Sequence, residues 1–483
     1  MQTPFPDHTQ IANLPLIEDL YKKYLENSES VEASWRYFFQ GIDFAGYLNK
    51  PDEKEGKDSS APLRIFKLIQ AYRRFGHLAA SINPLAQPKA PEELSLENLG
   101  FSESELSQEF PTLGWCGKPD APLKDILAAL QSVYASKIGV EYMDLGRAEL
   151  EHWLAARLEG SSSFALAPEE KLRLWEGLAK TDWLEQFLHR KYVGQTRFSL
   201  EGGETMIPLV SEMIQQAGML GVEEMLIGMA HRGRLNVLAQ ILEKPYAELL
   251  QEFEDDTVLA QVGHDDVKYH MGFSKEISLA SGKQIFVSMA ANPSHLESVD
   301  PVVLGQVRAL QVTKQDEKRA NIGALLIHGD ASIAGQGVIY ETLQLMNLPS
   351  YSIGGTLHLV VNNQIGYTTA PEEGRSTRYC TDIAKAFGCP VFHVNAEDPE
   401  SCLFAARLAV EVRQKFQCDV FIDLLCYRKY GHNEGDEPSY TQPEQYKTIR
   451  SKHSIREMYA AKLIEEGILT QSVAEAFEGQ YKE

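Results

Sequence analysis

Two pairs of polar residues stand where chemistry is expected, because each follows an apolar run. Asp330 comes after "GALLI" with only His328 and Gly329 between them, and Asn362 and Asn363 come directly after "TLHLVV". The C-terminal ends of parallel strands meet at one edge of a sheet, so a carboxylate and an amide oxygen could face one crevice there. Oxygen ligands suit a hard cation such as Mg²⁺, which shares its octahedral sphere with phosphates and water.

Each pair also has a simpler structural explanation. Asp330 could cap the following helix, and the asparagines could form an Asx turn, as these residue types often do at such corners. Either pair alone fits that explanation better. Taken together, one carboxylate, one amide oxygen and a nearby main-chain carbonyl would leave three positions for a ligand and solvent.

The elements that must position these residues follow Phe198, where short apolar runs alternate with helical patterns. This alternation predicts βαβ units and a doubly wound, mostly parallel α/β sheet. In residues 399–416, Phe404, Leu408, Val412 and Phe416 recur every four positions, which predicts a helix packed on the sheet. Strands are expected near residues 223–229, 284–290, 323–327, 356–361, 391–394 and 420–426.

The predicted organisation places a helical region before this α/β domain. Residues 61–198 carry long amphipathic patterns, and the polar stretch "NKPDEKEGKDSS" predicts a linker. The predicted parts are an N-terminal helical arm at 1–48, the linker at 49–60, a helical domain at 61–198, an α/β domain at 199–445 and a helical connection at 446–483.

Composition narrows the classes of function. The chain is 43% hydrophobic and 24% charged, and it has no apolar run long enough to span a membrane. Its net charge of −22 argues against nucleic-acid binding. Six cysteines without C-x-x-C spacing predict buried thiols in a reducing compartment. No leader sequence is evident, so the expected location is the cytoplasm, or the mitochondrial matrix if the source is a eukaryote.

Several motifs together carry a resemblance to a known family. "MAHRGRLNVLAQIL", "DVKYHMGFS", "NPSHLE", "HGDASIAGQG", "VVNNQIGYTT" and "CYRKYGHNEGDEPSYTQP" occur in this order. In order and spacing they resemble the E1 component of 2-oxoglutarate dehydrogenase, over most of the chain. Ala331 replaces the glycine of the wider thiamine diphosphate signature, but alanine is the residue expected in this family.

The resemblance implies thiamine diphosphate and Mg²⁺ as cofactors, with a transketolase-like diphosphate-binding domain. Asp330, Asn363 and the main-chain oxygen of Ile365 would hold the metal. Arg232 would contact the cofactor, as a guanidinium fork suits an anionic oxygen cluster. His432, in the glycine-containing loop after the last predicted strand, is a secondary candidate for cofactor contact. The alternatives are a surface salt bridge for the arginine and a solvated loop for the histidine.

The same comparison assigns a substrate site for 2-oxoglutarate. The implied catalytic residues are His231 and His270, and the implied substrate-binding residues are Arg197, Phe198, Ser274 and His295. Imidazoles and a guanidinium are suitable partners for a dianionic 2-oxo acid, and histidine can also move protons near neutral pH. Without the family context, a structural role would be favoured for any one of the thirteen histidines.

The implied reaction is oxidative decarboxylation, with the succinyl group passed to a lipoyl group on the E2 succinyltransferase and the chain linked through E2 to E3. The family also implies a homodimer. The N-terminal arm either docks on E2 or packs on its own protein. A nicotinamide-binding Rossmann enzyme is disfavoured, because no G-x-G-x-x-G follows a strand.

Members of this family are considerably longer, and their second α/β domain supplies the glutamate that activates the cofactor. We therefore expect this chain to be a fragment or one half of a split enzyme, incomplete for catalysis alone. The alternatives are a non-catalytic fragment that binds the cofactor or E2, and an E1 component or decarboxylase for a related 2-oxo acid.

Overall fold

The computed structural model describes residues 14–32, 35–36, 39–40, 60–160, 165–254 and 270–482. Contacts divide the chain into two compact units, residues 1–67 with 104–123, and residues 68–103 with 124–483. The predicted linker at 49–60 lies outside the described residues except for Ser60. Much of the predicted arm and residues 266–269 of "DVKYHMGFS" also lie outside them.

The first unit contains the predicted N-terminal helix and a short β-ribbon. Helix α1 spans Leu14–Glu26. The rings of Tyr21 and Tyr24 lie 5.0 and 5.5 Å from the ring of Phe39, an aromatic cluster that ties the helix to the segment after it. Strands β1 (Glu109–Pro111) and β2 (Asp120–Pro122) pair antiparallel.

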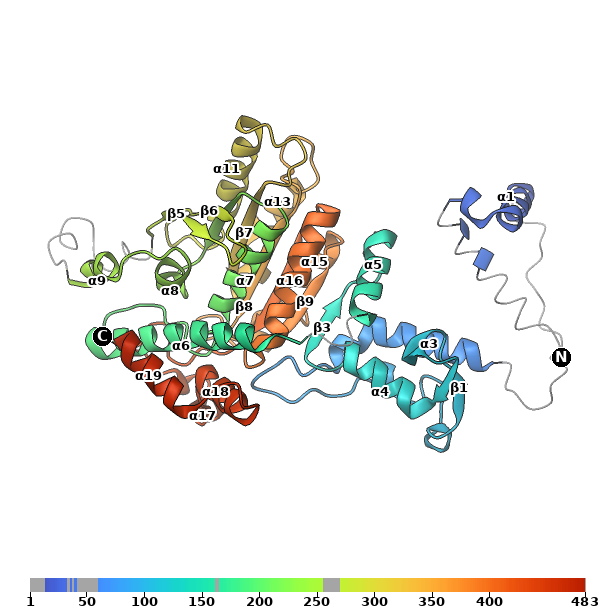
Figure 1. Ribbon diagram of the computed structural model, residues 1–483, viewed down its shortest axis with the longest axis horizontal. Coiled ribbons are helices and arrows are strands. Elements are labelled where there is room, and N and C mark those ends of the chain that lie inside the picture. Colours follow the sequence, from blue (N-terminus) through green and yellow to red (C-terminus); the bar gives the residue numbers. More distant parts are fainter. Residues whose placement is uncertain are drawn as a thin grey trace. The chain divides into compact units, whose positions relative to one another are not determined.

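The second unit is built on an eight-stranded sheet with the order β3-β9-β10-β8-β7-β4-β6-β5 (Figure 1). The six inner strands run parallel, and the outer strands β3 and β5 run antiparallel to their neighbours. The strands are β3 (Ile138–Glu141), β4 (Glu224–Met229), β5 (Phe273–Ser278), β6 (Gln284–Met289), β7 (Ile322–Gly329), β8 (Thr356–Asn362), β9 (Val391–Asn395) and β10 (Val420–Leu425).

All six strands expected from the sequence are confirmed, and they are the six parallel strands of the sheet. The two outer strands were not expected. Strand β5 alternates between partly buried and exposed residues and carries Lys275 and Glu276, so it lacks the apolar run of an inner strand. Strand β3 has only four residues and stands within the stretch 61–198, which is otherwise mainly helical.

Helices cover both faces of the sheet, as expected for a doubly wound fold. The crossovers through α11 (Val299–Thr313) and α13 (Gly337–Leu345) advance along the sheet in one direction, whereas the crossover through α16 (Pro399–Phe416) returns. Because such crossovers are right-handed, α16 lies on the opposite face. Helix α7 (Met206–Met219) packs beside α16 (Figure 1). The predicted apolar face of α16 is confirmed, since Leu408 and Val412 are buried.

The chain contains several further long helices. They are α3 (Ala61–Phe75), α4 (Leu123–Tyr134), α5 (Ala148–Glu159), α6 (Pro168–Lys191), α9 (Tyr246–Glu254), α17 (Pro443–Arg450), α18 (Ile455–Glu465) and α19 (Gln471–Lys482). The five cysteines from Cys380 to Cys426 are free and buried, as predicted. In the described part of the chain, no helix is long and apolar enough to cross a membrane.

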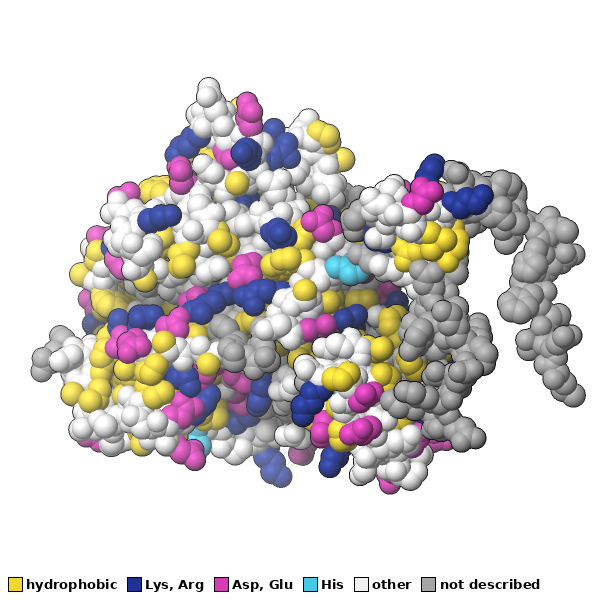
Figure 2. Space-filling model, turned by 45° about the vertical axis from the view of Figure 1, so that its right-hand side comes forward, with side chains coloured by type: hydrophobic (Ala, Val, Ile, Leu, Met, Phe, Trp, Pro, Cys, Tyr) yellow, Lys and Arg dark blue, Asp and Glu magenta, His cyan; other side chains and the backbone are white. Residues whose placement is uncertain are grey.

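Basic and acidic side chains lie next to one another on the face shown in Figure 2. Ion pairs also link neighbouring helices of the second unit. Arg407 of α16 contacts both Glu170 of α6 and Glu212 of α7, and Arg157 of α5 contacts Glu411 of α16. These pairs are partly exposed, so each contributes only about 0–1 kcal/mol to stability.

Candidate active site

Six of the predicted site residues come together at the C-terminal ends of four adjacent strands. The strand order β10-β8-β7-β4 places the segments after these strands side by side. A pocket of about 110 Å³ opens at this edge. Of the residues predicted from the sequence, it is lined by His231, Arg232, Asp330, Asn363, Ile365 and His432. The strand-end position expected for these residues is therefore where the structure places them.

The two asparagines after β8 have different roles. Asn362 makes the turn, because its Oδ1 accepts a hydrogen bond from Gln364 N at 3.2 Å and its Nδ2 donates to Asp423 Oδ1 at 3.0 Å. Asn363 is also buried and lines the pocket, but its Oδ1 has no hydrogen-bond partner among the described residues. A buried amide oxygen without a partner costs about 1–3 kcal/mol, unless a ligand satisfies it.

Asp330 lies across the pocket, at the first position of α12 (Asp330–Gly335). Its carboxylate is buried, and Oδ2 is 3.8 Å from Nη1 of Arg375. Burial raises the pKa of Asp330 to about 7, although Arg375 opposes this effect. A bound cation would favour the charged carboxylate that burial disfavours. The donor set of Asp330, Asn363 Oδ1 and the Ile365 carbonyl therefore fits a hard divalent cation.

Two arginines bring positive charge to the same pocket. Arg232 donates from Nη1 to the carbonyl oxygen of Ser199 at 2.8 Å, and Arg428 donates from Nη2 to that of Tyr367 at 2.9 Å. Neither guanidinium forms an ion pair with a carboxylate of the described residues. Burial and Arg428 lower the pKa of Arg232 to about 10, so it stays charged at neutral pH. Two cations without an acidic partner suit an anion such as a diphosphate.

Arg428 was missed in the sequence, although a signal was present. It stands in "CYRKYGH", within the loop that was already expected to cover this edge of the sheet. The pattern singled out the histidine of that loop and gave the arginine no role. A cation two residues after an apolar strand could have been assigned to the same edge by the argument used for Asp330.

A second pocket adjoins the first and contains the predicted substrate-side histidines. His231, His270 and His295 all line it, and His231 borders both pockets. His270 Nε2 is 2.9 Å from the hydroxyl oxygen of Ser294. Burial and the nearby Arg232 lower the pKa of His231 to about 3, so this imidazole is neutral at pH 7. It can therefore hydrogen-bond to a substrate but does not supply a positive charge.

Phe198 forms an aromatic wall beside His231 and His432, although it lines neither pocket. The ring of Phe198 lies 4.0 Å from that of His231 and 5.5 Å from that of His432. Phe198 has a left-handed backbone, with φ at 51°, and is held from both sides. Glu434 accepts hydrogen bonds from the main-chain N–H groups of Arg197 at 3.0 Å and Ser199 at 2.6 Å. The loop after β10 thus fixes the position of this wall.

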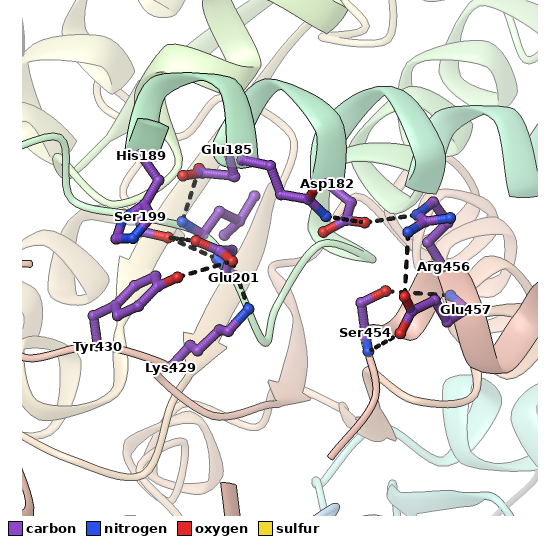
Figure 3. A network of polar contacts seen from close by, with 12 residues as sticks. Asp182, Glu185, His189, Ser199, Glu201, Lys429, Tyr430, Ser454, Arg456 and Glu457 are labelled. Atoms are coloured by element: carbon purple, nitrogen blue, oxygen red, sulfur yellow. Dashed lines mark hydrogen bonds and ion pairs between the residues drawn. The ribbon is translucent and has the colours of Figure 1, made fainter. Parts of the chain in front are cut away.

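Two predicted substrate-binding residues lie away from both pockets. The guanidinium of Arg197 is buried between Glu185 at 3.2 Å and Glu201 at 3.0 Å. Ser274 is exposed on β5 and hydrogen-bonds to Ser288. Figure 3 shows Glu201 below α6, where it also meets Lys429, Tyr430 and Ser199. A substrate role for Arg197 and Ser274 stays a prediction.

A buried chain of hydrogen bonds stands behind Asp330, and we call it the His328 network. Nδ1 of His328 is 2.6 Å from Glu297 Oε2, Nε2 of His328 is 3.0 Å from Nδ1 of His358, and Nε2 of His358 is 3.2 Å from Asp419 Oδ2. Three hydrogen bonds between two carboxylates require three N–H protons on two imidazoles, so one imidazole is cationic. Although burial opposes it, Glu297 and Asp300 raise the pKa of His328, whereas burial lowers that of His358. His328 is therefore the more basic of the two imidazoles.

A second buried chain, the His393 network, stands behind Asn363. Nδ1 of His393 is 2.8 Å from Asp423 Oδ2, and Nε2 is 3.0 Å from Glu141 Oε2. The other oxygen of Asp423 accepts from Asn362. Despite complete burial, the two carboxylates raise the pKa of His393 to about 9, and that histidine helps to lower the pKa of Glu141 to about 2. The outer strand β3 and its neighbour β9 are thereby linked to the turn that carries Asn363.

With this geometry in place, comparison with known proteins defines the class. The family model for the dehydrogenase E1 component matches residues 178–483, and the chain belongs to that family. Enzymes of this family depend on thiamine diphosphate. The match covers the whole parallel sheet and both pockets described above.

Further matches narrow the likeness to one kind of E1 component. The model for the 2-oxoglutarate dehydrogenase N-terminus matches residues 8–46. The chain is 41% identical to the 2-oxoglutarate dehydrogenase E1 component of Azotobacter vinelandii, over 98% of this chain and 53% of that protein. It is 39% identical to the Haemophilus influenzae protein of the same name, with the same coverage of both chains. It is 46% identical to the multifunctional 2-oxoglutarate metabolism enzyme of Mycolicibacterium vanbaalenii, over 89% of this chain and 35% of that protein. The chain spans about half the length of the two E1 components.

Proposed function

We propose that this chain forms the metal- and diphosphate-binding half of a 2-oxoglutarate dehydrogenase E1 active site. The observation that carries the proposal is the buried Oδ1 of Asn363, which has no hydrogen-bond partner among the described residues and belongs to a side chain that lines the same pocket as Asp330. In this proposal Asp330, Asn363 and the Ile365 carbonyl hold Mg²⁺, and Arg232 and Arg428 contact the diphosphate. His432 borders this cofactor from the loop after β10.

When bound, thiamine diphosphate supplies the electron sink for decarboxylation of a 2-oxo acid. The chain's own residues position the substrate and limit water around it. His231 and His270 are the proposed catalytic residues, with the neutral His231 able to accept or donate a proton at a substrate oxygen. Phe198 and His295 border the substrate, and the predicted contribution of Arg197 and Ser274 belongs to the same proposal.

The wider assembly is also part of the proposal. The succinyl product would pass to a lipoyl group on E2, which links the chain to E3, and the E1 component would act as a homodimer. The match of residues 8–46 to the 2-oxoglutarate dehydrogenase N-terminus supports E2 docking by the predicted arm at 1–48. The named relatives are bacterial proteins, and on that basis we propose a cytoplasmic location.

An acceptor assay tests this function. Reduction of ferricyanide is followed with 2-oxoglutarate, thiamine diphosphate and Mg²⁺, with and without the C-terminal half of the Azotobacter vinelandii protein. We expect turnover only when that half is supplied, and at least about 100-fold less turnover with pyruvate. Binding of thiamine diphosphate without turnover in either condition would favour a non-catalytic binding module instead.

A further inference from the structure

We infer that Glu297 is a positioning residue that fixes Asp330 in the orientation needed to bind the divalent cation. The inference rests on the proposed function, because it assumes that Asp330 is a metal ligand. Neither the sequence motifs nor the family resemblance gave Glu297 a role. It stands in "NPSHLE", more than thirty positions before Asp330 in the chain.

The carboxylate of Glu297 accepts hydrogen bonds from residues on both sides of Asp330 in the chain. Its Oε2 accepts a hydrogen bond from His328 Nδ1 at 2.6 Å, and its Oε1 accepts one from the hydroxyl of Ser332. His328 and Ser332 lie two positions before and two positions after Asp330. One side chain therefore spans the junction of β7 and α12 at which Asp330 stands. We call Glu297, His328 and Ser332 the Glu297 brace.

The backbone of Glu297 indicates that its side chain is needed at this position. Its φ is 69°, in the left-handed region that favours glycine, and it lies just before α11. Such a conformation persists in a non-glycine residue only where the surroundings impose it. The side chain is nevertheless 4% exposed and directed inward. A glycine would relieve the backbone but would leave His328 and Ser332 without their shared acceptor.

Within the brace, the ring nitrogen of His328 that does not contact Glu297 is also held in place. His328 Nε2 bonds to His358 on the neighbouring strand β8, and His358 in turn bonds to Asp419. The imidazole of His328 is therefore hydrogen-bonded at both ring nitrogens. Because His328 cannot move easily, it leaves Asp330 little freedom to move. Partners that orient a metal ligand in this way typically change metal affinity by 10–100-fold when they are removed.

A second metal site is the competing explanation. Glu297, Asp300 and His328 are buried groups of ligand type, with their ligand atoms within 4.8 Å of one another. The 2.6 Å between Glu297 Oε2 and His328 Nδ1 is the length of a charge-assisted hydrogen bond. Two atoms that each bind one ion at about 2.1 Å normally stand more than about 3 Å apart. The geometry is that of a brace rather than an ion cage.

The test compares Glu297→Gln with the matched variant Asp300→Asn in the full 483-residue chain. Both changes are isosteric and fall in the same buried cluster. Burial and Glu297 raise the pKa of Asp300 well above its usual range, and asparagine keeps the size and shape of that side chain. Glutamine at position 297 cannot accept from both His328 and Ser332. Mn²⁺ binding is followed by electron paramagnetic resonance with thiamine diphosphate present, and thermal unfolding is recorded alongside.

We expect Glu297→Gln to weaken Mn²⁺ binding by about 10-fold or more, and Asp300→Asn to leave it within about twofold. Amide hydrogen exchange over residues 329–332 should also accelerate in Glu297→Gln alone. If Glu297→Gln does not fold, Ser332→Ala removes the same brace from its other end and should weaken binding by about 3–10-fold.

Unchanged Mn²⁺ affinity in folded Glu297→Gln, or an equal loss in Asp300→Asn, would overturn the inference while leaving the proposed function standing. Binding of a second Mn²⁺ that Asp300→Asn removes would also overturn it, in favour of the ion cage. Absence of Mn²⁺ binding by the unmodified chain would overturn the proposed function together with the inference.

Discussion

Asp330 and Asn363 directly follow neighbouring strands, yet the two turns that carry these proposed ligands are supported in different ways. The His328 network reaches Asp330 directly, because Glu297 bonds to the residues two positions away on either side. The His393 network reaches Asn363 only through Asn362, whose amide spans Asp423 and the turn. The first turn is hydrogen-bonded on both sides of the proposed ligand Asp330. The second turn is hydrogen-bonded at the residue just before the proposed ligand Asn363.

Because of this difference, the effects of substitutions on stability can be distinguished from their effects on metal binding. Where the ligand and its support are adjacent residues, as in Asn362 and Asn363, one can be changed without the other. At Asp330 the brace and the ligand belong to one junction, so a change in the brace should alter metal affinity. The contrast predicts which substitutions will affect folding and which will affect the cofactor.

The largest expected effect comes from removing the histidine of the second network. His393→Leu leaves Glu141 and Asp423 buried without their shared partner, and breaking a buried pair in this way costs about 3–5 kcal/mol of unfolding free energy. Urea denaturation measures the loss. A loss below about 1 kcal/mol would show that this network does not hold β3 and β9 to the turn.

The pH dependence of stability tests the same contribution of His393. The pKa of His393 is about 9 in the folded chain, above the ordinary value of 6.5, so its stabilisation is complete below about pH 6.5 and is lost as pH rises through 9. The shift corresponds to about 3 kcal/mol. Unfolding free energies measured between pH 6 and pH 10 should fall accordingly, with a flatter profile in His393→Leu. Equal slopes in the two proteins would contradict the assignment.

A smaller pair of effects should distinguish the adjacent asparagines. Asn362→Ala deprives Asp423 and Gln364 of partners and should cost about 1–3 kcal/mol of unfolding free energy. Asn363→Ala removes a buried oxygen that has no partner among the described residues, so stability should stay the same or rise slightly. Chemical denaturation of both variants tests this. Equal destabilisation would mean that both asparagines serve only the turn.

The sequence predicted where the proposed ligands lie in the fold but not the residues that support them, for a physical reason. Asp330 and Asn363 could be found because a polar residue after an apolar run marks a strand end. His358, His393 and Asp423 also carried a signal, since each is a polar residue inside a strand that is buried on both faces. Their partners depend on the strand order β9-β10-β8-β7, which no local pattern encodes.

The same limit applies to Glu297 and to the outer strands. Glu297 contacts His328 because the segment just before α11 lies beside the C-terminal part of β7. Strands β3 and β5 are short or polar, and neither shows the apolar run that identified the six inner strands. Local periodicity therefore predicted the sheet and its edge, whereas the long-range contacts required the structure.

Calorimetric titration of thiamine diphosphate into the chain tests the central claim most directly. We predict saturable binding with Mg²⁺, no measurable binding in EDTA, and at least about 10-fold weaker binding in Asn363→Ala, whose fold should be intact. Binding of equal strength in EDTA, or unchanged affinity in Asn363→Ala, would contradict the account that Asp330 and Asn363 hold a cation for the diphosphate.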